Sequence, residues 1–133
     1  MCSLLTAGCG DGRPERVAVS GQVLIDGKPL DRGAVIFTPA SGRRSTGALD
    51  SQGRFELFTF ENGDGCTLGE HRVSIVCFED VGPTLREWFA PKKYMSPDTS
   101  GLTQTIDGPT DDVQIDLTWG KQKGPFTERG LGE

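Results

Sequence analysis

The chain has 133 residues, of which 14 are basic and 19 acidic, so its formal net charge at neutral pH is −5. This length suits one domain with short tails, and the acidic balance without a Lys/Arg cluster argues against nucleic acid as a partner. The 19 glycines and 8 prolines indicate many turns, and no apolar run approaches the roughly 20 residues of a membrane-spanning helix.

Residues 1–16 resemble the remnant of a truncated lipoprotein signal followed by a tether. Small and apolar residues occupy positions 5, 7 and 8 before Cys9, as in a lipobox, where a peptidase cuts before the cysteine and its sulfur carries diacylglycerol. Thr6 stands where Leu is usual, and the basic start of a signal peptide is missing. We therefore expect lipidation at Cys9 and a true translation start upstream of Met1. The alternative, a cytoplasmic accessory domain, follows if Met1 is the true start.

From residue 17 onward, hydrophobic residues recur with a period of two, which is typical of β-strands. The clearest alternation places Val113, Ile115 and Leu117 on one face of a strand. Short strands at this spacing, separated by Gly- and Pro-containing turns, predict an all-β fold over residues 17–118. We expect an antiparallel β-sandwich of about seven strands with Ig-like architecture. The expected strands lie near residues 17–25, 34–37, 43–49, 54–59, 69–77, 102–106 and 112–118.

Three segments do not fit the strand pattern. Residues 85–89 could form a helical turn, and residues 119–133 are polar and Gly-rich, so we expect a flexible C-terminal tail. Residues 91–102 are too rich in Pro, Ser and Gly for a helix, yet they contain Tyr94, the only tyrosine. We expect this segment to wrap one end of the sandwich, with the Tyr94 ring buried and its hydroxyl hydrogen-bonded.

Seven short segments carry a recognisable order of turn and strand residues. They are Val19–Val23, Asp26–Leu30, Val35–Pro39, Asp50–Phe55, Gly69–Val73, Pro91–Tyr94 and Ser100–Leu102. Together they resemble the bacterial transthyretin-like (prealbumin-like), or carboxypeptidase regulatory-like, domain. The resemblance implies a β-sandwich in a small envelope lipoprotein or accessory module, generally without assigned activity. One departure is His71, where the family usually has Tyr.

The residues needed for catalysis by related folds are missing. Hydroxyisourate hydrolases need two histidines, and intradiol dioxygenases bind iron through two Tyr and two His, whereas this chain has one of each. A nucleophile elbow of the form Gly-x-Ser-x-Gly is also absent from the sequence. We therefore predict a protein that is not an enzyme and needs no cofactor.

The cysteines and the histidine do not form a metal-binding pattern. On an extended strand Cys66 and Cys77 would be well over about 10 Å apart, too far to share a metal or a disulfide. If the loop before Gly69 folds back, a disulfide between Cys66 and Cys77 is still possible. His71 has the parity of the core-facing residues, so we expect a neutral, hydrogen-bonded imidazole at the sandwich edge. Four acidic residues near the last strand lack the spacing of a calcium loop: Asp107, Asp111, Asp112 and Asp116.

Two binding functions follow from these observations. The first is a lipid-anchored cell-envelope domain, periplasmic or on the outer surface, that presents the sandwich to a partner protein or a surface polysaccharide. The second is a carbohydrate-binding module in which Trp88, Phe89 and Tyr94 form an aromatic patch for stacking on a sugar. The alternative to the second function is that the same three rings are buried at the open end of the sandwich and are not available to a sugar.

Overall fold

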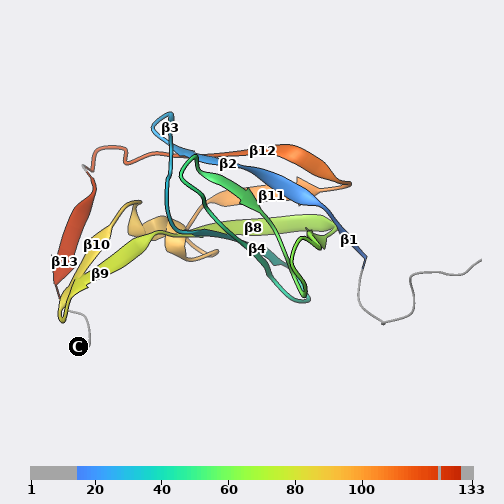
Figure 1. Ribbon diagram of the computed structural model, residues 1–133, viewed down its shortest axis with the longest axis horizontal. Coiled ribbons are helices and arrows are strands. Elements are labelled where there is room, and N and C mark those ends of the chain that lie inside the picture. Colours follow the sequence, from blue (N-terminus) through green and yellow to red (C-terminus); the bar gives the residue numbers. More distant parts are fainter. Residues whose placement is uncertain (1–14, 123, 130–133) are drawn as a thin grey trace, which may run out of the picture.

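The computed structural model describes residues 15–122 and 124–129, which form two facing sheets and a three-stranded sheet at one end (Figure 1). A further two-stranded sheet pairs residues 16–17 with residues 66–67. The all-β prediction is confirmed, although the described residues form more and shorter strands than the seven or so expected. The elements are β1 (Arg16–Val17), β2 (Val19–Ile25), β3 (Lys28–Pro29), β4 (Ala34–Pro39), β5 (Ser45–Ala48), β6 (Arg54–Glu56), β7 (Cys66–Thr67), β8 (Gly69–Val76), β9 (Phe78–Gly82), β10 (Leu85–Trp88), the 3₁₀ helix η3 (Lys92–Met95), β11 (Leu102–Ile106), β12 (Thr110–Leu117) and β13 (Phe126–Arg129).

One layer of the sandwich has the strand order β11-β8-β4-β5, and all of its pairs are antiparallel. The other layer has the order β12-β2-β3, with β6 also paired to β2. Here β12 runs parallel to β2, so the expectation of a wholly antiparallel sandwich is wrong at this pair. The chain crosses from β11 in the first layer to β12 in the second, so β12 does not enter its sheet through a hairpin with β2.

The core lies between these layers because alternate residues of each strand face inward. Phe37 of β4 and Phe55 of β6 bridge the layers, with ring centroids 6.3 Å apart. One edge is closed by the segment after β6: Leu57 N–H donates to the Val19 carbonyl in one layer, and Phe58 N–H donates to the Thr46 carbonyl in the other. Further buried core residues are Val19, Val23, Val35, Val73, Ile75, Ile106, Val113, Ile115 and Leu117.

A separate three-stranded sheet, in the order β13-β10-β9, lies at the opposite end of the long axis from β1 (Figure 1). It corrects two expectations from the sequence. Residues 85–88 form strand β10 where a helical turn was expected, and residues 126–129 form strand β13 within the expected flexible tail. Both strands are held by aromatic pairing, because Trp88 of β10 stands opposite Phe78 on one neighbour and Phe126 on the other.

Candidate functional site

Trp88, the first member of the predicted aromatic patch, belongs to the interior of the end sheet. Its side chain is 4% exposed, and its ring centroid lies 5.1 Å from that of Phe78 and 6.4 Å from that of Phe126. The indole Nε1–H donates to Glu128 Oε1 over 3.2 Å. The ring therefore has no open face for a sugar.

Phe89 follows Trp88 directly, and successive residues of an extended chain point to opposite faces. Its backbone N–H donates to the Cys77 carbonyl, and its partly buried ring packs against the sandwich core. The Arg32 guanidinium lies over the ring, 4.0 Å from its centroid, and also pairs with Glu79. Phe89 and Trp88 therefore do not share a binding surface.

Tyr94 lies in η3 and is 4% exposed. Its hydroxyl accepts a hydrogen bond from Thr118 N–H at 3.2 Å and donates to the Thr118 carbonyl at 3.4 Å. The wrapping segment is also fixed by Ser100, whose hydroxyl donates to the Val73 carbonyl. The prediction of a buried, hydrogen-bonded tyrosine is confirmed. With two of its three rings buried, the predicted patch of Trp88, Phe89 and Tyr94 is not an exposed stacking platform.

His71 is fully buried on the inner face of β8. Its Nε2 lies 2.8 Å from the Thr67 carbonyl, which can only accept, so Nε2 carries the hydrogen. The imidazole ring packs 5.7 Å from the Phe37 ring. The expected hydrogen bond and inward orientation of His71 are confirmed, and its Nδ1 is buried without a hydrogen-bond partner among the described residues.

Cys66 and Cys77 are both buried and unpaired, so they form no disulfide. Burial raises the pKa of the Cys66 thiol to about 11 and that of Cys77 to about 12. Both thiols therefore stay protonated at neutral pH, and Cys77 Sγ donates to the Arg32 carbonyl. Within residues 15–122 and 124–129, no group of three or more His, Cys, Asp or Glu side chains could hold a metal ion.

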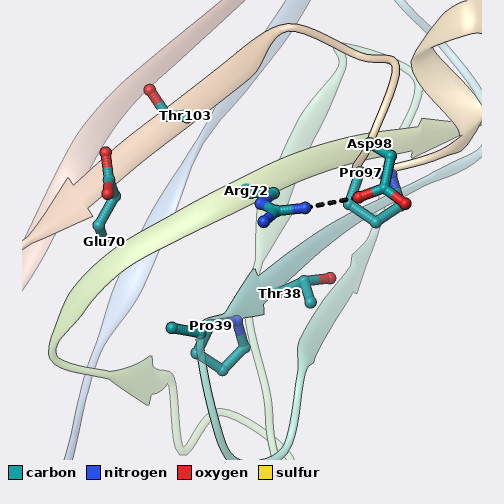
Figure 2. A pocket seen from close by; sticks show the side chains of 8 residues that line it. Thr38, Pro39, Glu70, Arg72, Pro97, Asp98 and Thr103 are labelled. Carbon is teal, nitrogen blue, oxygen red and sulfur yellow. Dashed lines mark hydrogen bonds and ion pairs between the residues drawn. The ribbon is translucent and has the colours of Figure 1, made fainter.

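One surface groove, with a volume of about 400 Å³, lies on the outer face of the β11-β8-β4-β5 sheet. Figure 2 shows Glu70 and Arg72 of β8 between Thr103 of β11 and the end of β4, with the loop at Pro97–Asp98 beside them. This outer face carries polar side chains because the inner face of the same strands holds the core. The remaining lining residues are Thr38, Pro39 and Ala40.

One basic and two acidic side chains line this groove. Arg72 Nη1 lies 2.5 Å from Asp98 Oδ1, and the two side chains are 61% and 75% exposed. Such an exposed pair contributes little to stability, and Glu70 adds a second carboxylate beside it. The groove offers hydroxyl groups and an already paired guanidinium, which suits contacts with a polar partner better than with a strongly charged one.

A second groove, of about 250 Å³, lies between Pro91–Lys93 and Thr118–Gln122. The partly buried Trp119 lines it and meets the Phe126 ring edge-on, with centroids 6.0 Å apart. Lys92 Nζ lies 2.6 Å from Glu128 Oε2, and its hydrogen bond lowers the pKa of that carboxyl. Reading the sequence did not reveal this groove, because its two lysine-bearing segments are distant in the chain.

The predicted lipidation residue, Cys9, lies outside the described residues. Within them, no helix is long and apolar enough to cross a membrane. A scan against protein-family models, a search of curated proteins and a search of solved structures found no match for this chain. The chain therefore has to be interpreted from its own residues.

Proposed function

We propose that this protein is a non-enzymatic cell-envelope domain, lipid-anchored through Cys9, that binds a partner protein or a surface polymer. One observation carries the proposal: among the described residues, the buried polar and nucleophilic side chains make contacts within the fold, although His71 Nδ1 has no hydrogen-bond partner there, and the grooves lie at the surface. His71 bonds the Thr67 carbonyl, Ser45 Oγ lies 2.8 Å from Thr59 Oγ1, and both described thiols are protonated in the core. This arrangement supports a role in contact through the surface.

The position of β1 agrees with an anchor at the N-terminal end. Cys9 precedes Arg16 by seven residues, a span of at most about 25 Å. An acyl chain on Cys9 would keep the β1 end near the bilayer and direct the end sheet of β9, β10 and β13 away from it, since these lie at opposite ends of the long axis (Figure 1). The transthyretin-like resemblance is part of this proposal and rests on the order of the sequence segments alone.

The anchor is tested by expressing the protein in its native reading frame with a clickable palmitate analogue. We expect label and membrane association in the unchanged protein, and release to the soluble fraction in Cys9→Ser, because stable attachment depends on acyl chains. Cys2→Ser is the matched control and should stay labelled and membrane-bound. An unlabelled protein, or membrane association unchanged by Cys9→Ser, would contradict the anchor.

The binding role is tested by sedimenting the soluble Cys9→Ser protein with isolated envelopes, before and after protease treatment. Binding lost after protease points to a protein partner, and binding that survives points to a polymer. Absence of sedimentation with either preparation would contradict the proposed function.

A further inference from the structure

The groove between Pro91–Lys93 and Thr118–Gln122 concentrates positive charge on an acidic protein. Three of the five lysines of the chain, Lys92, Lys93 and Lys121, stand in the two described segments that the fold brings together. The hydrogen bonds between Tyr94 and the backbone of Thr118 fix their separation. The wrapping segment and the chain after β12 thus form the two walls of one site.

The acidic side chains near this groove are already engaged. Glu128 receives hydrogen bonds from both Lys92 and Trp88. Asp26 accepts from Thr118 Oγ1 at 2.8 Å and lies 3.4 Å from the backbone nitrogen of Trp119. None of the lining residues is acidic.

Two lysines consequently remain available for an incoming anion. Among the described residues Lys93 makes no ion pair, and its Nζ lies 5.1 Å from the centroid of the Tyr94 ring. Lys121 does not itself line the groove, but it stands between the lining residues Gly120 and Gln122, is exposed, and makes no ion pair within the described part of the chain. The groove therefore keeps a net positive charge where the protein as a whole is negative.

Trp119 gives the same groove a rigid aromatic wall. The backbone of Gly124 lies close against the indole, since a Cβ there would come within 2.1 Å of Cζ2. Phe126 supports the ring from its edge, at 6.0 Å between centroids. A fixed, partly exposed indole offers a flat apolar surface of the kind on which a pyranose ring stacks. Gln122 lines the groove with an amide that both donates and accepts hydrogen bonds.

We propose that this groove binds an acidic saccharide, with a sugar ring against Trp119, its carboxylate or phosphate beside Lys93 and Lys121, and hydroxyl groups toward Gln122. The inference rests on the proposed function and names the ligand class of its polymer partner. The Trp119 ring contacts Phe126 of β13, and β13 lies at the opposite end of the molecule from β1 (Figure 1). A protein held at Cys9 would therefore present this site away from the membrane.

The test uses the full chain with Cys9→Ser and follows the two indole N–H signals by NMR during titration. The probes are tetragalacturonate for the carboxylate and mannopentaose phosphate for the phosphate. Their controls are neutral maltotetraose and tetraglutamate, an acid without sugar rings. We expect at least one acidic saccharide to shift the Trp119 signal but not that of Trp88, and to bind at least about tenfold more tightly than either control.

Variants separate the site from general charge effects. Lys93→Gln, at an exposed position, should weaken binding about tenfold, as for the loss of one charge-assisted hydrogen bond. Trp119→Phe should also weaken it, with the unfolding midpoint measured in parallel. Arg44→Gln removes an exposed positive charge from the loop between β4 and β5 and should leave binding unchanged.

Equal binding of tetraglutamate, unchanged affinity in Lys93→Gln, or no binding of either acidic saccharide would overturn this assignment. Envelopes that bind the protein while both acidic probes fail would refute the groove alone and leave the proposed function in place.

Discussion

The sandwich and the end sheet are built from similar short strands but depend on different interactions. The sandwich buries one inward face from each of two layers, so its core contains residues such as Phe37 and Ile75 that are at most 1% exposed. The end sheet has one row of aromatic rings, in which Phe78 and Phe126 remain partly exposed on either side of Trp88. Three strands with a hydrophobic face are the minimum for independent stability, and this sheet buries only one aromatic row, so we expect it to be the less stable region.

The largest expected effect on the free energy of unfolding is at Tyr94. Tyr94→Ala removes a 4% exposed ring that plugs one end of the sandwich, together with its two hydrogen bonds to Thr118. We expect a loss of about 3 kcal/mol in the free energy of unfolding, measured by urea denaturation, with hydrogen exchange rising first in residues 90–101.

Tyr94→Phe is the companion variant, since it keeps the ring and removes only the hydroxyl. It should cost about 1 kcal/mol. A denaturation midpoint unchanged in Tyr94→Ala would show that the wrapping segment does not stabilise the sandwich.

The sequence predicts the sandwich better than the end sheet for a physical reason. Strands such as β12 alternate three apolar residues with polar ones, and that pattern is local. β13 contains a single large apolar residue, Phe126, after a Gly-Pro pair, so its pairing with β10 depends on contacts with residues about 40 positions away. If residues 85–89 had been predicted as a strand, Trp88 and Phe89 would have been placed on opposite faces, because neighbouring side chains on a strand point to opposite sides.

The candidate site was less predictable than the fold. Lys92 and Lys121 are 29 positions apart, so the sequence shows no basic cluster. Their segments become neighbours in the fold, where Tyr94 contacts Thr118. The one available signal was compositional: most of the lysines of the chain fall in two short segments. The inward orientation of His71 was predictable because it depends only on its place in β8, and Cys77, directly after that strand, continues the same alternation.

A smaller effect is expected at the β1 end, where Asp64 organises the loop after β6. Its carboxylate accepts from the backbone N–H groups of Thr59, Phe60 and Glu61 and lies 3.0 Å from Arg16 Nε. Burial alone would raise the pKa of Asp64, but these hydrogen bonds and Arg16 together lower it below its ordinary value. We expect Asp64→Asn to cost about 2 kcal/mol at pH 7, as for hydrogen bonds to a charged group.

The sign of the pH dependence follows from the lowered pKa of Asp64. Its stabilisation is complete above the pKa of the unfolded chain, about 3.9, and is lost as the pH falls through the lower folded value. Urea denaturation at several pH values should therefore show the difference between the unchanged protein and Asp64→Asn shrinking below about pH 4. Asp107→Asn, at an exposed position, is the control. A difference that stays constant down to pH 2 would contradict this account.

The smallest effect on global stability is expected at Trp88, although it is the most buried ring of the end sheet. If the end sheet and the sandwich unfold together as one cooperative unit, Trp88→Ala should lower the free energy of unfolding by about 3–5 kcal/mol. If the end sheet instead opens on its own, the amides of β10 and β13 should exchange more than about tenfold faster while those of β4 and β8 keep their protection. The global midpoint should then move by less than about 0.5 kcal/mol, as it should in Val81→Ala, a control at a 48% exposed position on β9. Equal loss of protection in the sandwich strands would show that the aromatic row belongs to the same cooperative unit as the core, and that the two regions differ in architecture but not in stability.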